Sequence, residues 1–302
     1  MQRLTVALDW TPNVNHIGFF VAQAKHFYSE LGLEVELLTP SADNYAITPA
    51  KKVELGQADF ALCPIESVIS YRTKKQPFDL LAIASLLQTD LSAIVVRKDS
   101  GITSPRALDG KIYSSYQARY EDGIVRAMVT NDGGKGDLKI IYPAKLGIWN
   151  TLLSGQSDAT WIFLNWEGVQ VEASAPKFRY FKMRDYQIPY SYSPVIAASA
   201  SRAAVNKEAY RLFLNATKKG YLYCQEFPDE AVSILAPHLP LHDQSIDLKR
   251  ALEVSAPHFG TSEHWGIMEE TAVKKFLDWV QENGLEKHEL AFSTIISNGY
   301  LA

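Results

Sequence analysis

The feature that most constrains the fold is the alternation of short β-branched runs with helical stretches along the chain. A strand is expected at 4–8, a helix at 19–31 and a second strand at 34–38, and similar units follow as far as residue 164. Parallel strands need crossover connections that are long enough to hold a helix. The sequence therefore predicts an α/β protein built on parallel sheets.

The length of 302 residues exceeds the size at which one hydrophobic core usually stops growing, so two lobes are expected. The strand–helix pattern breaks at 99–102, shortly before Pro105, and this indicates where the chain first crosses from one lobe to the other. The apolar run 192–198 indicates where the chain returns. Lobe 1 is predicted to comprise 1–98 plus 193–302, and lobe 2 to comprise 99–192. The helices expected after residue 207 should pack on lobe 1. Because ligands of open α/β sheets bind beyond the carboxyl ends of strands, we expect a ligand cleft between the lobes.

The composition excludes several classes of protein. The 30 basic and 34 acidic residues are scattered and give a net charge of -4, so no basic stripe is available for nucleic acid. No apolar run approaches the roughly 20 residues of a transmembrane helix. The first residues enter a strand pattern without a signal region, which predicts a cytoplasmic protein. A periplasmic or lipid-anchored protein whose signal had been removed would have the same pattern, and this alternative stays open.

The segment 9–16 follows the first predicted strand and precedes a helix. It offers an indole for stacking, amide donors and acceptors, and an imidazole. A Pro/Asn turn with an aromatic plug is the structural alternative. A second turn, after the strand that ends at Leu62, has a similar position. The candidate ligand-binding residues of lobe 1 are Trp10, Asn13, Asn15, His16, Glu66 and Ser67.

Lobe 2 has a comparable segment where the strand 159–164 ends in Asn165, Trp166 and Glu167. The carboxylate of Glu167 only accepts hydrogen bonds, as recognition of the amino group of an aminopyrimidine requires. Its structural alternative is a glutamate that satisfies backbone donors at a helix N-terminus.

Two further groups complete the candidate site in lobe 2. Tyr186 and Tyr190 lie just before the return crossing and combine a flat ring with a polar tip, although tyrosines that pack a strand edge would have the same pattern. A polar cluster between a strand and a helix could hold a phosphate or carboxylate, or could be an ordinary helix start. Its members are Ser115, Tyr116, Arg119 and Tyr120.

Signatures of catalysis are lacking in the sequence. It has no phosphate-binding Gly-rich loop, no Gly-x-Ser-x-Gly elbow and no His-Glu-x-x-His helix. Neither the seven histidines nor Cys63 and Cys224 have the spacing of metal ligands, and both cysteines are expected to be buried apolar residues. We therefore predict no catalytic residue, no metal and no cofactor, and favour binding over catalysis.

Several motifs together resemble a known family over residues 4 to about 230. They are the run Leu8-Asp9-Trp10-Thr11-Pro12-Asn13 with His16, the turn Gly56-Gln57-Ala58-Asp59, the stretch Asp99-Ser100-Gly101-Ile102, the stretch Asn131-Asp132-Gly133-Gly134, and Asp185-Tyr186-Gln187-Ile188-Pro189. The chain is similar to the SsuA/THI5-like superfamily, which includes formylaminopyrimidine-binding proteins of thiamin-precursor ABC transporters and yeast-type thiamin-pyrimidine synthases. The resemblance implies a two-lobed periplasmic-binding-protein-like fold of type II.

The resemblance also implies roles for individual residues. It places Trp10, Asn13 and His16 at the pyrimidine, Glu167 on its amino edge, and Tyr186 and Tyr190 beside it. The chain departs from the synthases, which have a cofactor-bearing lysine at the position of Cys63, a histidine at the position of Ser67, and a cysteine-rich iron motif that is absent here.

Three hypotheses follow for the function. The first is binding of a thiamin-related aminopyrimidine of the hydroxymethyl or formylamino type, as a solute-binding protein that serves an ABC permease or as a cytoplasmic homologue. The second is a synthase-like enzyme of thiamin-pyrimidine formation. The third is binding of another planar or anionic ligand, such as a flavin precursor or a sulfonate, because one fold hosts several ligand classes.

Overall fold

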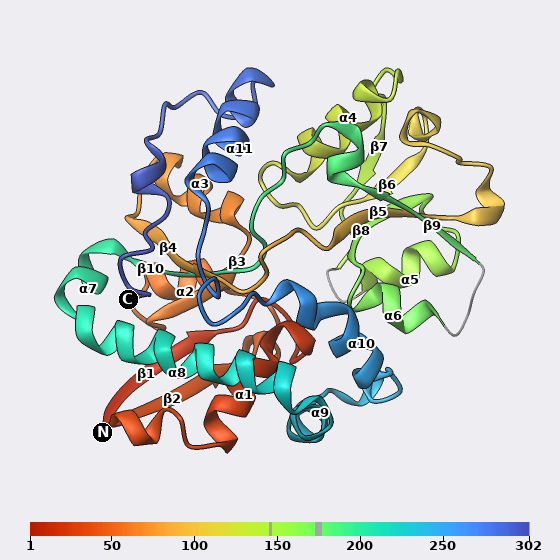
Figure 1. Cartoon of the computed structure of the whole chain (residues 1–302). Helices are drawn as coiled ribbons and strands as arrows, with labels where there is room; N and C mark the ends of the chain where they lie inside the picture. The colour runs from red at the N-terminus through yellow and green to blue at the C-terminus, as the bar shows by residue number, and fades with distance from the viewer. Residues whose placement is uncertain (145–146, 173–176, 302) are drawn as a thin grey trace. The chain divides into compact units, whose positions relative to one another are not determined.

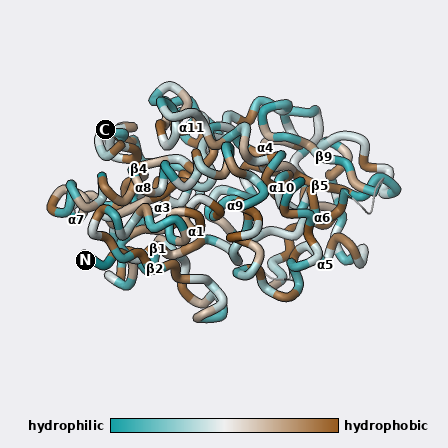
Figure 2. The backbone as a smooth tube through the Cα atoms, turned by 60° about the horizontal axis from the view of Figure 1, so that its bottom comes forward, coloured by the Kyte–Doolittle hydropathy of each residue, from teal (hydrophilic) through white to brown (hydrophobic). Residues whose placement is uncertain are grey.

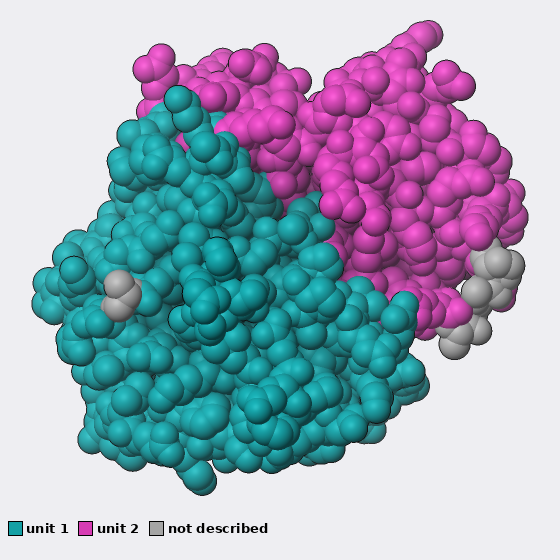
Figure 3. Space-filling view, viewed as in Figure 1, with its two compact units in different colours: residues 1–90, 191–274, 290–302 teal, residues 91–190, 275–289 magenta. Residues whose placement is uncertain are grey.

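The computed structural model describes residues 1–144, 147–172 and 177–301. The chain divides into two compact units, which are coloured separately in Figure 3. Unit 1 comprises 1–90, 191–274 and 290–302, and unit 2 comprises 91–190 and 275–289. Each unit contains one five-stranded mixed sheet with helices, and each is described by itself below.

The sheet of unit 1 has the strand order β2-β1-β3-β10-β4. Its first three strands run parallel, with Ala7 paired to Leu38 on one side and to Ala61 on the other. β10 is antiparallel to both of its neighbours. The carboxyl ends of β1, β2 and β3 therefore lie at one edge of the sheet. The strands are β1 (Gln2–Ala7), β2 (Leu33–Leu38), β3 (Phe60–Cys63), β4 (Leu80–Ser85) and β10 (Val195–Ser199).

Helices cover both faces of this sheet. The connection from β1 to β2 contains α1 (Ile17–Ala24), and the connection from β2 to β3 contains α2 (Pro49–Glu54). These two connections run across the sheet in opposite directions. Because such crossovers are right-handed, the two helices lie on opposite faces of the sheet. α1 packs beside α8 (Lys207–Glu226) so closely that a Cβ atom added to Gly220 would lie 2.0 Å from the carbonyl oxygen of Gly18 (Figure 1). The remaining helices are α3 (Ile65–Thr73), α7 (Ala200–Val205), α9 (Pro228–Leu235) and α10 (Leu248–Ser255).

The core of unit 1 is rich in aromatic rings. Phe60 of β3 stacks on Phe213 of α8 with centroids 4.1 Å apart, and Phe213 also stacks on Phe19 of α1. The buried residues of α8 recur every three or four positions, and most of them are apolar. Figure 2 colours the whole chain by hydropathy. The helix predicted at 19–31 ends earlier, at Ala24, because His26 adopts a left-handed φ of 64°.

The sheet of unit 2 has the order β7-β6-β8-β5-β9. β6 and β8 are parallel, and β5 is antiparallel to both β8 and β9, so β6, β8 and β9 end at the same edge. A cluster of Val95, Leu152, Ile162, Val171 and Phe178 forms a buried core. The strands are β5 (Ser92–Arg97), β6 (Ile112–Ser114), β7 (Lys139–Ile141), β8 (Ala159–Phe163) and β9 (Phe178–Lys182), and the helices are α4 (Glu121–Asn131), α5 (Ile148–Leu153) and α6 (Glu167–Glu172).

The observed division differs from the predicted one at 91–98, at 275–289 and at 191–192, which belongs to unit 1. The sequence analysis placed the first crossing at residue 99, but β5 pairs with β8 and β9 and so belongs to the second sheet. The last helix, α11 (Glu270–Glu282), was expected on lobe 1, but residues 275–289 group with unit 2, where Phe276 contacts Tyr190 at 5.4 Å between ring centroids. Within the described ranges, no helix combines the length and apolar character needed to cross a membrane.

Candidate functional site

The turn after β1 is shaped by the side chain of Asn13. Its Oδ1 accepts the backbone N–H of Asn15 at 2.8 Å, and its Nδ2 donates to the carbonyl of Thr11 at 3.0 Å. The carbonyl of Asn15 accepts the hydroxyl of Tyr221. Asn13 and Asn15 are both buried. Both polar ends of the Asn13 side chain therefore hold the turn, as the structural alternative proposed.

His16 and Asp9 form a polar pair at the same turn. The backbone N–H of Asn13 donates to Nδ1 of His16 at 3.3 Å, so the ring proton is on Nε2, which donates to Oδ1 of Asp9 at 2.8 Å. His16 is 0% exposed, whereas the side chain of Asp9 is 27% exposed. His16 therefore orients the carboxylate from behind, and Asp9 is the member of the pair that solvent reaches.

The indole of Trp10 lies next to this carboxylate in the sequence and is only partly buried. It makes an edge-to-face contact with Tyr45, with ring centroids 5.5 Å apart at 63°. Thr11 continues the turn and donates its hydroxyl to Asp243 at 3.4 Å. The carboxyl end of β1 thus brings a flat ring and an oriented carboxylate to one edge of the sheet.

The turn after β3 lies at the same edge. Pro64 precedes α3, and Glu66 and Ser67 lie in the first turn of that helix. Glu66 is buried, and Ser67 is partly buried. Burial and the nearby carboxylates of Asp9 and Glu66 raise the pKa of the Cys63 thiol. The thiol is therefore uncharged and a poor nucleophile at neutral pH.

In unit 2 the loop between β6 and α4 folds around Glu121. This buried carboxylate accepts the hydroxyl of Tyr113 at 2.7 Å and the backbone N–H groups of Tyr116 and Ala118. Burial raises its pKa. The chain's own carboxylate therefore occupies two backbone donors of the loop that could otherwise bind an anion.

The other polar residues of this loop also have partners within unit 2. Ser115 is buried and donates to Asp122 at 2.7 Å. Arg119 and Tyr120 both contact Glu286, the arginine at 2.9 Å and the tyrosine hydroxyl at 2.6 Å. These contacts join the start of α4 to residues 275–289, whereas the N-cap of α4 itself has no side-chain hydrogen bond.

The segment after β8 starts α6 at Glu167. Oε2 of Glu167 accepts the backbone N–H of Phe163 at 3.0 Å, as in the helix-start alternative. Asn165 and Trp166 are buried, whereas Glu167 is partly exposed. Burial and the carboxylates of Glu167 and Glu121 raise the pKa of Tyr116 well above its ordinary value.

Tyr186 and Tyr190 follow β9, which ends at the same edge as β6 and β8. Tyr186 packs edge-on against Phe181 with centroids 6.1 Å apart, and its carbonyl accepts Asn131. Tyr190 packs against Trp161 at 5.2 Å. Both rings are partly buried.

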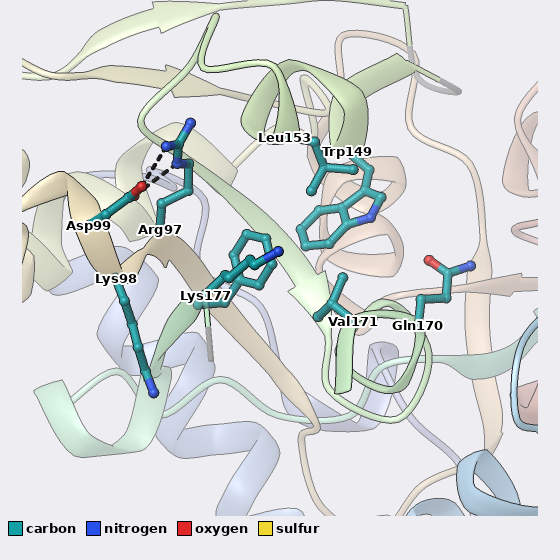
Figure 4. A pocket seen from close by; sticks show the side chains of 9 residues that line it. Arg97, Lys98, Asp99, Trp149, Leu153, Gln170, Val171 and Lys177 are labelled. Carbon is teal, nitrogen blue, oxygen red and sulfur yellow. Dashed lines mark hydrogen bonds and ion pairs between the residues drawn. The ribbon is translucent and has the colours of Figure 1, made fainter. Parts of the chain in front are cut away.

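A depression of about 760 Å³ lies at the opposite end of the unit 2 strands (Figure 4). Trp149, Leu153 and Val171 provide apolar lining, and the rim holds Lys98 and Lys177. The Arg97 guanidinium and the Asp99 carboxylate, also in the lining, form an ion pair. None of the predicted site residues lines this depression.

Three residues near Trp10 were not among the predicted site residues: Asp9, Tyr45 and Asp243. Asp9 lies in the segment 9–16, so its position directly after the first strand could have indicated it. Tyr45 follows β2, and the shared edge of parallel strands was the signal that could have indicated it. Asp243 comes from a distant short helix, and no local pattern connects it with β1. Among the described residues, no group of three or more His, Cys, Asp or Glu side chains could hold a metal ion.

Comparisons with known proteins agree with this architecture. The family model described as NMT1/THI5 like matches residues 13–231. A formylaminopyrimidine-binding protein of Halalkalibacterium halodurans is 25% identical over 78% of this chain and 70% of its own length. A 4-amino-5-hydroxymethyl-2-methylpyrimidine phosphate synthase of Legionella pneumophila is 24% identical over 79% of this chain and 74% of its own length.

The fold has close counterparts among solved structures. The alkanesulfonate-binding protein SsuA of Xanthomonas axonopodis pv. citri, bound to MOPS, superposes with a TM-score of 0.73 at 12% identity and covers 98% of both chains. This likeness confirms the α/β periplasmic-binding-protein fold with two mixed five-stranded sheets. Because the family model covers more than half of the sequence, the chain belongs to the NMT1/THI5-like family.

Proposed function

We propose that this solute-binding-like protein binds a small planar aminopyrimidine related to thiamin, of the hydroxymethyl or formylamino type, without converting it. The observation that carries the proposal is the Asp9 carboxylate, oriented by His16 and exposed beside Trp10 at the carboxyl end of β1. A heteroaromatic amine can stack on the indole while its amino group donates to the carboxylate.

The name of the relative from Halalkalibacterium halodurans supports this ligand class, because that protein is called a formylaminopyrimidine-binding protein. Glu167, Tyr186 and Tyr190 remain candidate ligand contacts of unit 2, as the resemblance of the sequence implies. An ABC permease would receive the ligand, as the resemblance of the sequence implies.

A synthase-like enzyme is the second candidate, and the relative from Legionella pneumophila favours it. The chemistry of Cys63 supports binding instead. This buried thiol, whose pKa is raised, stands where the synthases carry a lysine, and a thiol cannot form the imine that a lysine amine forms with an aldehyde cofactor.

Isothermal titration calorimetry with 4-amino-5-hydroxymethyl-2-methylpyrimidine and its formylamino analogue tests the proposal. We expect saturable binding to the wild-type protein and recovery of unchanged ligand afterwards. The Asp9→Asn substitution replaces an acceptor oxygen with an amide donor, and should weaken binding about tenfold or more. Asp229→Asn, at an exposed carboxylate paired with Lys249, is the matched control and should bind normally.

Absence of binding by the wild-type protein at millimolar pyrimidine would contradict the proposal. Saturable binding of an alkanesulfonate under the same conditions would favour the anionic alternative. Consumption of the ligand, followed by mass spectrometry, would favour the enzyme.

A further inference from the structure

The turn after β2 holds an unusual tyrosine. Asn44 and Tyr45 both adopt left-handed backbone conformations, with φ of 52° and 61°. Non-glycine residues adopt this region at an energetic cost, which is larger for a bulky residue than for asparagine. Asp43 anchors the turn through an ion pair of 2.8 Å with Lys52 of α2. The fold therefore holds the Tyr45 ring in one place in spite of backbone strain.

The hydroxyl of Tyr45 is buried and has no hydrogen-bond partner among the described residues. Leaving a buried donor without a partner costs about 1–3 kcal/mol. Its ring packs edge-on against Trp10. Burial, together with the carboxylates of Asp243 and Asp9, raises its pKa to about 12, so the hydroxyl keeps its proton at neutral pH.

The Asp9 carboxylate has a complementary feature. Its Oδ1 accepts from His16, while Oδ2 has no hydrogen bond to any of the described residues. Tyr45 and Asp9 thus offer one donor and one acceptor, both next to the indole of Trp10. Asp243 accepts from Thr11 close by.

We infer that Tyr45 and Asp9 form a donor–acceptor pair that recognises one edge of the ligand ring, where an acceptor nitrogen adjoins an amino group. The Tyr45 hydroxyl donates to the ring nitrogen, and Oδ2 of Asp9 accepts from the amino group. This inference rests on the proposed function and deepens it, because it adds Tyr45 as a specificity-determining residue. A ring that carries the amino group but lacks the adjacent nitrogen would leave the hydroxyl without a partner.

Calorimetry with two probes tests the pair. The probes are 4-amino-5-hydroxymethyl-2-methylpyrimidine and its aniline analogue, in which C–H groups replace both ring nitrogens. Tyr45→Phe removes only the hydroxyl and should weaken binding of the pyrimidine roughly tenfold. The same substitution should change binding of the aniline analogue by less than about twofold.

Tyr210→Phe is the matched control. Tyr210 also has a buried hydroxyl without a partner among the described residues, but it packs on Phe60 in the core. Both substitutions should leave the melting temperature of the free protein unchanged or raised, because each removes an unsatisfied hydroxyl. Only Tyr45→Phe should weaken pyrimidine binding.

The outcomes separate the two proposals. If the wild-type protein binds the pyrimidine and Tyr45→Phe binds it within about twofold, the inference about Tyr45 is overturned while the proposed function stands. A lowered melting temperature for Tyr45→Phe would assign the hydroxyl a structural role and overturn the inference as well. If the wild-type protein binds neither probe, both proposals fall.

Discussion

Single side chains decide how the turn after β1 presents its polar groups. His16 has both ring nitrogens engaged inside the protein, one by the Asn13 backbone and one by Asp9. The His16 ring therefore lies behind the partly exposed carboxylate of Asp9. A residue that looked like a direct ligand contact in the sequence is thus positioned to act through its neighbour.

His16→Ala should lower the free energy of unfolding by about 1–3 kcal/mol, because the Asn13 N–H loses its acceptor in a buried setting. Urea unfolding monitored by circular dichroism measures the change. His264→Ala removes a histidine at an exposed position and should change stability by less than about 0.5 kcal/mol. Equal effects of the two substitutions would contradict the role of His16.

The Tyr113→Phe substitution tests the hydrogen bond from Tyr113 to Glu121, the buried carboxylate of the loop between β6 and α4. Burial raises the pKa of Glu121, so its protonated form is favoured in the folded state, and stability falls as pH rises through that pKa. Loss of the Tyr113 hydroxyl raises this pKa further. The variant should therefore lose about 1–3 kcal/mol of stability at neutral pH and distinctly less below about pH 4.5, where the carboxyl is protonated in both states.

The measurement is urea unfolding of wild type and variant across this pH range. Tyr142→Phe is the control, because that hydroxyl donates to Asp122 at an exposed position. A loss of stability in Tyr113→Phe that stays constant over the whole range would contradict a Glu121 whose protonation in the folded state depends on the Tyr113 hydroxyl.

At this scale the sequence indicated where polar and aromatic side chains gather, but not all of the contacts that they make within the protein. Trp10 and Glu167 follow strands, which local patterns reveal, and both lie at the expected edges. Asn13 bonds within its own turn, whereas the contact of Arg119 depends on Glu286, a partner that no short motif specifies. Glu286 lies 167 residues from Arg119, so sequence patterns gave no reason to pair them.

Among the elements, the contact between α1 and α8 depends on two glycines that allow the helices to approach closely. Gly220→Ala would ordinarily favour a helix, because alanine has the higher helix propensity. Here the added Cβ would lie 2.0 Å from the Gly18 carbonyl oxygen and 3.1 Å from the Cβ of Ala22. We expect the helices to be forced apart at a cost of about 1–3 kcal/mol.

Differential scanning calorimetry measures this loss. Gly147→Ala is the matched control, since a Cβ at Gly147 would meet no atom within 4 Å. A melting temperature of Gly220→Ala equal to that of the control would show that the helix pair adjusts without strain.

The elements themselves were predicted better than their pairing. The pattern at 92–97 identified β5 as a strand, because three β-branched residues follow one another there. Its assignment to the first sheet was wrong, since pairing with β8 and β9 is set by segments that follow it by about 60 residues or more. Likewise, nothing local in α11 indicates that its two halves group with different units.

For the whole molecule, we expect each unit to have its own local stability, because each unit has its own sheet. Leu152→Ala opens the core of unit 2 and should cost about 2–5 kcal/mol there. Hydrogen exchange should accelerate in β5, β8 and β9 and stay near the wild-type rate in β1, β3 and β10. Phe213→Ala should give the reverse pattern, because its ring packs in unit 1. Uniform acceleration in both sheets would contradict separable units.

The position of β10 has a consequence for synthesis on the ribosome. This strand lies between β3 and β4, yet it is translated more than 100 residues after both of them. Until it emerges, β3 and β4 have unpaired backbone groups that can bind other chains. All five strands of the second sheet emerge during that interval. The nascent chain should therefore complete the sheet of unit 2 before the sheet of unit 1. A chaperone that shields β3 and β4 would act in that interval.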